Sequence, residues 1–343
     1  MKRIALLGAT GSIGRQAIAV IDANPGLELV AASSGSTPID GLAALTQTGG
    51  DPTELLERAQ PDVVLNAVVG FAGLVPTMWA LEHGVTLALA NKESLVAAGE
   101  LAIAARKRGQ GELIPVDSEH SALFQCAQLG EPESLVLTAS GGPFRGRTRD
   151  ELQNVTPDEA LAHPTWSMGP KITVDSATLA NKGLEIIEAH FLFDIGYDCI
   201  DVVIHPTSIV HGLVRFRDGA PIAHLGYPDM RVPISYALTY PDRAATPVPP
   251  LDLRTLEFHE PDTETFRMLA LAREAGEKGG TYPCAYNAAN EVAVQAFLDG
   301  RIGFLEIATA VEDVLARVDG APARNLDELV EADRHARELV AVA

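Results

Sequence analysis

Short apolar runs alternate with Ala- and Leu-rich stretches of helical spacing through the first 140 residues. The stretches between the runs, such as Arg15–Ala23 and Val75–His83, place apolar residues three and four positions apart, as a helix does. Strands that alternate with helices in this way are typical of a parallel, doubly wound sheet. The predicted strands are Arg3–Leu7, Leu27–Ala32, Asp62–Val68, Thr86–Ala90, Leu113–Val116 and Ser134–Thr138.

The pattern changes after Asp150. Prolines and polar residues interrupt Pro157–Pro170 too often for a regular element, so we predict an ordered loop or lid there. A long helix is predicted from about Ser176 to Phe193, followed by β-rich runs. These runs are Val202–Ile204, Ile209–Phe216 and Ile222–Leu225. Together they predict a central α+β domain over residues 117–240, which the candidate chemistry below makes the catalytic domain.

The last third of the chain is predicted to contain a linker and a helical domain. Prolines punctuate residues 241–261, which is typical of a linker. Residues 262–343 are predicted to form a C-terminal helical domain that includes helices at 288–298 and 304–317. The spacing of apolar residues in the final segment, 325–343, predicts an amphipathic helix.

Composition places the chain among globular proteins and excludes several classes of partner. Of 343 residues, 47% are hydrophobic and 21% charged. No apolar run approaches the roughly 20 residues that span a bilayer. The formal net charge of −20 disfavours nonspecific binding to nucleic acid or to an anionic membrane. Cys126, Cys199 and Cys284 are far apart, which argues against a disulfide framework or a thiolate zinc site and indicates a reducing cytoplasm.

A glycine-rich turn, Gly8–Gly14 (GATGSIG), follows the first predicted strand. Its glycines would let backbone N–H groups approach a pyrophosphate at the start of the next helix. The alternative is a strand–helix turn without a ligand, but the alternating context favours nucleotide binding and a Rossmann-like domain over residues 1–116. At the end of the second strand, Ser33–Ser36 provides neither an acidic nor a basic side chain, and no Lys or Arg occurs between Arg15 and Arg58. The missing acid favours NADP over NAD.

Polar clusters follow two more of the predicted strands. Asn91–Ser94 (NKES) lies at a carboxyl end, where doubly wound sheets bind ligands. A capped helix start, with Asn91 as N-cap and Glu93 in the first turn, is equally consistent with it. After the strand that ends at Val116, an extended chain would direct Asp117 and Glu119 to the same side, as oxygen ligands for Mg²⁺ or Mn²⁺. An exposed acidic helix start is the alternative.

The segment Asp175–Glu185 (DSATLANKGLE) carries a further acidic and basic cluster. Asn181, Lys182 and Glu185 are three and four residues apart, so they share one face of the predicted helix. A solvated Lys182–Glu185 pair is the alternative, but the opposite face is apolar. A carboxylate from this helix would complete a cation site with the two that follow the strand.

Two loops supply further candidates. Ser140–Phe144 contains adjacent glycines that would let backbone approach a phosphate. His163–Gly169 lies in the predicted lid and offers a histidine, an indole and a thioether, groups that can cover a substrate and exclude water. His205 and His211, in a β-rich run, are interpreted as core residues rather than catalytic ones.

In their order along the chain, these motifs resemble the signatures of the 1-deoxy-D-xylulose 5-phosphate reductoisomerase family. The resemblance extends from residue 1 to about Arg317. It implies an NADPH- and divalent-metal-dependent homodimeric enzyme. The implied reaction isomerises and reduces 1-deoxy-D-xylulose 5-phosphate to 2-C-methyl-D-erythritol 4-phosphate, in the non-mevalonate route to isoprenoid precursors. The motifs are Gly8–Gly14, Asn91–Ser94, Val116–Ala122, Ser140–Phe144, His163–Gly169 and Lys171–Glu185.

The resemblance also implies a role for each matching residue. The implied ligands of Mn²⁺ or Mg²⁺ are Asp117, Glu119 and Glu185. The implied contacts to the substrate backbone are Lys92, Ser118 and Glu119. The implied phosphate site contains Ser140, His163, Ser176, Asn181 and Lys182. The implied NADPH contacts are Gly8, Thr10, Gly11, Ser12, Ile13, Asn91, Glu93 and Gly169. The implied lid residues over substrate and nicotinamide are Trp166 and Met168.

One region departs from the family pattern. The segment between the second strand and Pro61 is shorter than usual, and Ser33–Ser36 replaces the usual loop with a basic or amide residue at the 2′-phosphate site. Two rival interpretations remain. One is a metal-independent Rossmann dehydrogenase, which EDTA would not inhibit, and the other is a nucleotide-sensing protein that binds NADPH without turnover.

Overall fold

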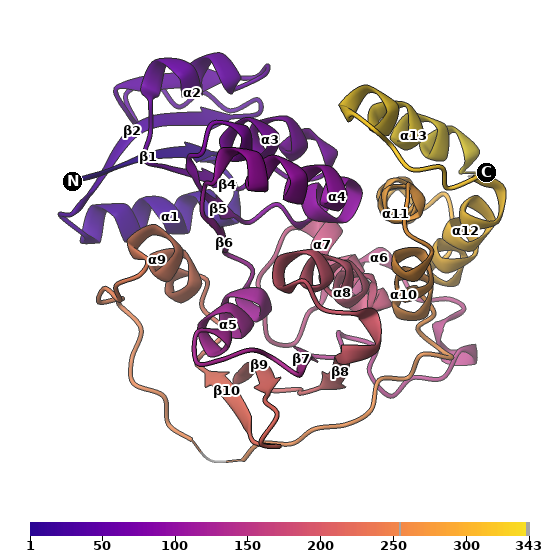
Figure 1. Cartoon of the computed structure of the whole chain (residues 1–343). Helices are drawn as coiled ribbons and strands as arrows, with labels where there is room; N and C mark the ends of the chain where they lie inside the picture. Colours follow the sequence, from indigo (N-terminus) through magenta and orange to yellow (C-terminus); the bar gives the residue numbers. More distant parts are fainter. Residues whose placement is uncertain (254, 341–343) are drawn as a thin grey trace. The chain divides into compact units, whose positions relative to one another are not determined.

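The computed structural model describes residues 1–253 and 255–340, drawn in Figure 1. The chain forms two compact units, each assembled from separate stretches of sequence. The first contains Met1–Ser94, Glu100–Gln128 and Asp229–Asp252. The second contains Leu95–Gly99, Leu129–Pro228 and Leu253–Ala343. Position 254 of the predicted linker and positions 341–343 of the predicted final helix lie outside the described residues.

The first unit is built on a parallel sheet with the strand order β3-β2-β1-β4-β5-β6. The predicted doubly wound sheet is therefore confirmed. Its order reverses direction at β1, so the carboxyl ends of β1 and β4 flank the point where such sheets bind ligands. The strands are β1 (Lys2–Leu7), β2 (Leu27–Ser34), β3 (Leu45–Thr48), β4 (Val63–Asn66), β5 (Thr86–Leu89) and β6 (Leu113–Pro115).

Helices cover both faces of this sheet, and one of them comes from much later in the sequence. Ile4 and Leu6 pack in one cluster with Ile234 and Leu238 of α9, which lies beside α1 (Figure 1). Lys2 Nζ also donates to the carbonyl of Leu238, at 3.2 Å. The helices are α1 (Ser12–Ala23), α2 (Thr53–Ala59), η1 (Phe71–Gly73), α3 (Leu74–Glu82), α4 (Lys92–Gly109), α5 (Ser118–Ala127) and α9 (Arg231–Thr239).

The second unit contains a mixed sheet with the order β10-β9-β7-β8. The strand predicted at Ser134–Thr138 exists, but its place in the doubly wound sheet is wrong, because it pairs here with β8 and β9. The remaining strand of the first sheet is β3, which was not predicted. Its short, half-polar sequence LTQT contains no apolar run. The strands are β7 (Ser134–Ala139), β8 (Ile200–Ile204), β9 (Val210–Arg215) and β10 (Pro221–Leu225).

The predicted helix from Ser176 to Phe193 is wrong as a single element, because two helices meet there. Leu179 adopts a left-handed conformation with φ 63° between them. The Thr178 hydroxyl donates to the carbonyl of Asp175 (3.2 Å) and accepts from the N–H of Ala180 (3.2 Å), which competes with the helical backbone pattern. The helices of this unit are η2 (Asp150–Leu152), α6 (Pro157–Leu161), α7 (Pro170–Thr178), α8 (Ala180–Phe193), η3 (Tyr197–Cys199), α10 (Met268–Lys278), α11 (Tyr282–Leu298), α12 (Phe304–Arg317) and α13 (Leu326–Leu339).

The other predicted segments of the second unit are close to what forms. The predicted lid contains one short helix, α6, which begins with a capping box between Thr156 and Glu159. The described residues of the 241–261 linker form no helix, and His259 makes an isolated bridge to Ile204. Helix α13 confirms the predicted final helix over its described residues, with Leu329 and Ala336 buried.

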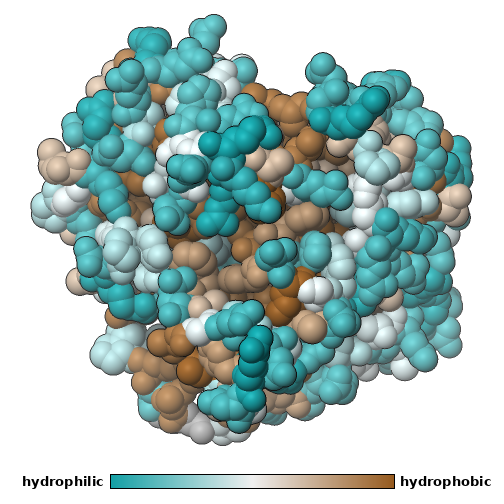
Figure 2. Space-filling model, viewed as in Figure 1, coloured by the Kyte–Doolittle hydropathy of each residue, from teal (hydrophilic) through white to brown (hydrophobic). Residues whose placement is uncertain are grey.

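The face drawn in Figure 2 is largely hydrophilic, with apolar areas between the polar residues. Among the described residues, no helix has both the length and the apolar character needed to cross a membrane. Cys126, Cys199 and Cys284 are free thiols.

Candidate active site

The glycine-rich turn of the first unit is shaped by two close backbone approaches. Gly8 has φ +83°, and a Cβ there would lie 2.5 Å from the carbonyl oxygen of Ala67. A Cβ on Gly14 would lie 2.3 Å from the carbonyl oxygen of Gly8. Helix α1 begins after Gly11, which has no side chain to cap it, so the first-turn N–H groups are suited to a bound anion. The turn therefore has the form that a pyrophosphate site needs.

The end of β2 is held by its own serines. The Ser33 carbonyl accepts from the N–H groups of Gly8 (3.0 Å) and Ala9 (2.8 Å), which ties β2 to the glycine-rich turn. The buried Ser34 hydroxyl donates to the carbonyl of Thr37, at 2.5 Å. Ser36 is exposed. The groups presented at this strand end are thus hydroxyls and backbone, as the sequence predicts.

Asn91 is both a helix cap and a clamp. Its side chain accepts from the N–H of Ser94 at 3.0 Å, so the predicted capped start of α4 is confirmed. Its Nδ2 also donates to the carbonyls of Val68 (2.7 Å) and Gly70 (2.9 Å) and to Glu93 Oε2 (3.1 Å). These bonds fix the loop after β4 against α4, at the carboxyl end of the sheet.

Asp117 lies between two partners in the first unit. Lys92 Nζ is 2.8 Å from Asp117 Oδ2, and His120 Nδ1 is 3.1 Å from Oδ1. The predicted extended arrangement of Asp117 and Glu119 is wrong: Asp117 is the N-cap of α5, and Glu119 is in its first turn. The alternative, an exposed acidic helix start, is correct about the helix but wrong about exposure. The Asp117 side chain is only 13% exposed. Ser118 Oγ donates to Glu119 Oε2 at 2.6 Å.

His120 was missed in the sequence interpretation. It is fully buried, and it contacts Asp117 because residues three apart meet at the start of a helix. In a helix, the spacing of three residues would have indicated the contact between Asp117 and His120.

The second unit brings Ser140, His163 and Ser176 together. His163 Nε2 lies 3.0 Å from Ser140 Oγ and 3.1 Å from Ser176 Oγ. His163 Nδ1 accepts from the backbone N–H groups of Thr165 (3.1 Å) and Trp166 (2.9 Å), so the ring proton is on Nε2. Ser140 Oγ also accepts from the N–H of Gly142 at 3.1 Å. The structure thus brings two hydroxyls of the predicted phosphate site around one imidazole.

Burial lowers the pKa of His163 from its ordinary value of 6.5. Protonation would place a proton on Nδ1 and break both bonds to the lid backbone. Because the folded state binds this proton more weakly than the unfolded chain, stability is retained above the unfolded pKa of about 6.5 and falls below it. We expect the melting temperature of the unmodified protein to fall more steeply between pH 7.5 and 5.5 than that of His163→Gln.

The exposed His335 provides the control for this titration. His335→Gln should keep the pH dependence of the unmodified protein. Equal slopes for the unmodified protein and His163→Gln would contradict the assignment of this titration to His163.

Glu185 is buried in the second unit between two donors on its own helix. Asn181 Nδ2 donates to Oε1 at 2.6 Å, and Lys182 Nζ donates to Oε2 at 2.5 Å. The Lys182 and Glu185 side chains are 4% and 0% exposed, so the predicted common face is confirmed and the solvated pair is wrong. Removing one partner of such a buried ion pair strongly destabilises a fold. The intact pair by itself, however, is weak evidence of a net gain in stability.

The lid residues precede α7 in the chain, and the backbone N–H of Trp166 donates to His163 Nδ1. Trp166 lies against His211, with ring centroids 6.2 Å apart. Met168 is half-buried, and Gly169 is the N-cap of α7. His205 is a core residue as predicted: it is fully buried, and its Nδ1 bonds to the carbonyl of Glu257 at 2.7 Å. His211 is also buried, but its contact with Trp166 places it beside the lid.

The fold and these clusters define an α/β nucleotide-binding enzyme with a separate α+β unit that carries anion-binding and acidic groups. Family models agree with this class over most of the chain. A model described as 1-deoxy-D-xylulose 5-phosphate reductoisomerase matches residues 4–53 and 47–99, and the C-terminal domain model of the same name matches residues 113–193. A model described as DXP reductoisomerase C-terminal domain matches residues 225–339.

Individual proteins are similar over nearly the whole length. The 1-deoxy-D-xylulose 5-phosphate reductoisomerase of Thermomicrobium roseum is 49% identical, with 98% of this chain and 96% of the relative covered. The structure of the enzyme from Zymomonas mobilis in complex with NADPH has 38% identity and a TM-score of 0.90, covering 99% of this chain and 98% of that one. A reductoisomerase in complex with NADPH, fosmidomycin and magnesium has 37% identity and a TM-score of 0.89, with 99% and 97% covered. The chain belongs to the 1-deoxy-D-xylulose 5-phosphate reductoisomerase family.

Proposed function

We propose that this chain catalyses the NADPH- and divalent-metal-dependent conversion of 1-deoxy-D-xylulose 5-phosphate to 2-C-methyl-D-erythritol 4-phosphate, a step toward isoprenoid precursors. The observation that carries the proposal is the 49% identity over 98% of this chain to a relative of that name. Related structures hold NADPH, magnesium and fosmidomycin. The clusters in each unit supply chemical groups suited to these ligands.

NADPH would bind at the carboxyl ends of β1, β4 and β5. The glycine-rich turn offers its backbone N–H groups to the pyrophosphate, through Thr10, Gly11, Ser12 and Ile13. Asn91 holds the adjacent loop in place through its bonds to Val68 and Gly70. The hydride chemistry belongs to the cofactor, so the task of these residues is to orient it.

The acidic residues fit a hard divalent cation. Asp117, Glu119 and Glu185 offer carboxylate oxygens, which suit Mg²⁺ or Mn²⁺. Asp117 and Glu185 each have a buried lysine as neighbour, at 2.8 Å and 2.5 Å, and this fixes their orientation. When bound, the cation supplies Lewis-acid polarisation of the ketose carbonyl. Lys92, Ser118 and Glu119 would contact the substrate backbone and hold its oxygens for the reaction.

The phosphate of the substrate would bind to the second unit. Ser140, Ser176 and the Nε2–H of His163 form one set of donors, and Asn181 and Lys182 provide an amide and a cation. Binding energy from the unreactive phosphate can be used to close a lid over the reacting carbons. His163 would link phosphate binding to lid closure. Its Nε2 faces the serine hydroxyls of the phosphate site, while its Nδ1 accepts from the lid backbone at Thr165 and Trp166. Trp166 and Met168 would then exclude water from substrate and nicotinamide.

We also propose that the protein is a cytoplasmic homodimer. Free thiols at Cys126, Cys199 and Cys284 are consistent with a reducing compartment. The net charge of −20 makes nucleic acid and anionic membranes poor partners. Size-exclusion chromatography with light scattering would test the dimer.

The first test is an NADPH oxidation assay with 1-deoxy-D-xylulose 5-phosphate and Mn²⁺. Oxidation that requires the substrate and is abolished by EDTA would support the proposal. Oxidation that EDTA leaves unchanged would favour a metal-independent dehydrogenase. NADPH binding without turnover, in protein shown to bind Mn²⁺, would favour a nucleotide-sensing role.

The segment Ser33–Ser36 at the end of β2 predicts a small preference for NADPH over NADH. Neutral hydrogen bonds contribute about 1 kcal/mol each, less than bonds to charged groups, so we expect a ratio of kcat/KM of roughly tenfold. Ser36→Arg should raise that ratio by about tenfold more, because a guanidinium can bind the 2′-phosphate bidentately. Ser36→Met adds bulk without a charge or a hydrogen-bond donor and should not raise the ratio. A ratio in the hundreds for the unmodified protein would contradict this interpretation.

A further inference from the structure

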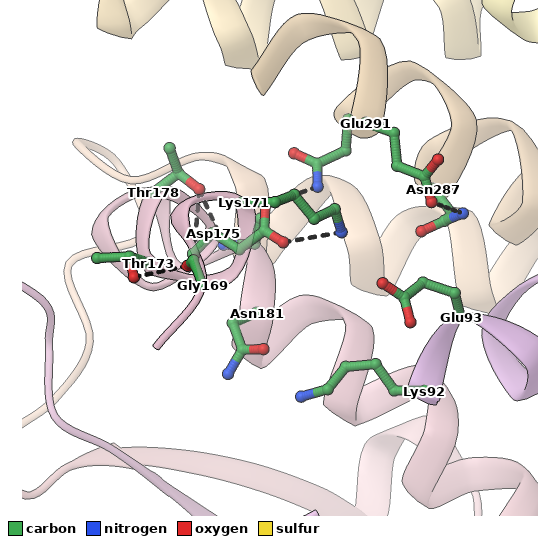
Figure 3. A network of polar contacts seen from close by, with 12 residues as sticks. Lys92, Glu93, Gly169, Lys171, Thr173, Asp175, Thr178, Asn181, Asn287 and Glu291 are labelled. Atoms are coloured by element: carbon green, nitrogen blue, oxygen red, sulfur yellow. Dashed lines mark hydrogen bonds and ion pairs between the residues drawn. The ribbon is translucent and has the colours of Figure 1, made fainter. Parts of the chain in front are cut away.

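A buried polar network joins α7 to α11 within the second unit. Asp175 Oδ2 on α7 is 2.9 Å from Lys171 Nζ one turn earlier, and Asp175 Oδ1 accepts from Asn290 Nδ2 on α11 at 2.8 Å. The Asp175 side chain is 1% exposed, and Asn290 is fully buried. Figure 3 shows the Lys171–Asp175 pair beside α11. Neither Asp175 nor Asn290 is among the residues assigned above to ligands.

A buried carboxylate is costly unless it is paired and hydrogen-bonded, so this contact is directional in a way that apolar packing is not. The rest of the buried surface of α7 includes Val174 and Ala177, whose apolar contacts are non-directional. The amide–carboxylate bond is directional, because hydrogen bonds weaken steeply as their geometry departs from linear. Asn290 therefore fixes where α7 lies on α11.

Helix α7 carries groups of the proposed site at both of its ends. Gly169, near the end of the predicted lid, is its N-cap, and Thr173 Oγ1 donates to the Gly169 carbonyl at 2.8 Å. Ser176, the residue after Asp175, lies 3.1 Å from His163 Nε2. The loop Ser140–Phe144 also packs against this turn, since a Cβ on Gly142 would lie 2.7 Å from the Ser176 carbonyl oxygen. A shift of α7 would move the Ser176 hydroxyl away from His163.

We propose that Asn290 is a positioning residue for the phosphate site, acting through Asp175 to hold α7, and with it the Ser176 hydroxyl, in place. This inference rests on the proposed function, because it concerns binding of the same substrate phosphate. It assigns Asn290 no contact with substrate. A purely structural role would lower stability without separating KM from kcat.

The test compares Asn290→Ala with Asn287→Ala in the NADPH oxidation assay. Asn287 is equally buried on the same helix but donates to Glu291, at 3.1 Å, rather than to Asp175. Asn290→Ala should raise KM for 1-deoxy-D-xylulose 5-phosphate about tenfold, the loss expected for a hydrogen bond to a charged group, with kcat and the Kd for NADPH within twofold. Asn287→Ala should leave KM unchanged. Equal rises in KM for the two variants would overturn the proposal.

Two further measurements separate positioning from other causes. In the double variant Asp175→Asn with Asn290→Asp, the bond between the two side chains is restored with its donor and acceptor exchanged, while Lys171 loses the carboxylate at position 175. KM should therefore be lower than in either single variant, with partial recovery toward the unmodified value. Hydrogen exchange should be faster across 170–178 in Asn290→Ala, with α12 unchanged, and this readout needs no turnover. Unchanged exchange in α7 would overturn the proposal. A lack of turnover in the unmodified protein would instead count against the proposed function.

Discussion

Glu185→Gln is expected to lower kcat for 1-deoxy-D-xylulose 5-phosphate by about 10³-fold while the Kd for NADPH stays within about twofold. The substitution keeps the size of the side chain but replaces an anionic oxygen with an amide nitrogen. Glu185 is fully buried and lies 2.5 Å from Lys182, so the change also removes a negative charge beside a buried ammonium. Weaker Mn²⁺ binding, measured by calorimetry, should accompany the loss of turnover.

Two companion variants make the result specific to the Glu185 carboxylate. Glu185→Asp retains the charge on a shorter side chain and should recover part of the activity. Glu274→Gln removes a carboxylate from an exposed position on α10 and should change neither kcat nor Mn²⁺ binding. Turnover within tenfold of the unmodified protein for Glu185→Gln would remove Glu185 from the proposed metal ligands. A melting temperature for each variant separates loss of chemistry from loss of fold.

Gly14→Ala is expected to abolish measurable NADPH binding and to destabilise the first unit by roughly 3 kcal/mol or more. The added Cβ would lie 2.3 Å from the carbonyl oxygen of Gly8 and 2.6 Å from that of Ala9. Both neighbours are backbone, so relief requires α1 to move away from the turn whose N–H groups would hold the pyrophosphate. Fluorescence titration with NADPH and thermal unfolding would measure the two effects.

Gly26→Ala provides the matched control, because a Cβ at that position meets no atom within 4 Å. It should bind NADPH as the unmodified protein does. Gly11→Ala is intermediate, since its Cβ would lie 3.4 Å from the Gly8 carbonyl oxygen. We expect Gly11→Ala to fold normally and to weaken NADPH binding through its proximity to the ligand. Normal NADPH affinity in Gly14→Ala would contradict the placement of the pyrophosphate at this turn.

The sequence was sufficient wherever local chemistry decided the structure. The five strands predicted between Arg3 and Val116 all formed, because each is a short apolar run beside a turn. The cap at Asn91 and the common face of Asn181, Lys182 and Glu185 were also predictable, since both depend on spacing within one helix. The glycine-rich turn indicated its own geometry, because only glycine tolerates such close approaches.

Wrong predictions arose where a helix breaks or begins. The helix predicted from Ser176 onward breaks at Leu179, because the Thr178 hydroxyl bonds to the backbone on both sides. Asp117 and Glu119 were expected on an extended strand, but α5 begins at Ser118. The resulting turn brings His120 to Asp117, a contact that an extended chain would have prevented.

By itself, the sequence determined the class of sheet, the nucleotide turn and the residues that resemble a reductoisomerase. Only the tertiary structure decided that β7 belongs to the second sheet, that α9 packs beside α1, and that Asn290 holds Asp175. The physical reason is the same in each case. An apolar or polar pattern reports that a side chain is buried, while the partner that buries it is chosen by contacts between residues far apart in the chain.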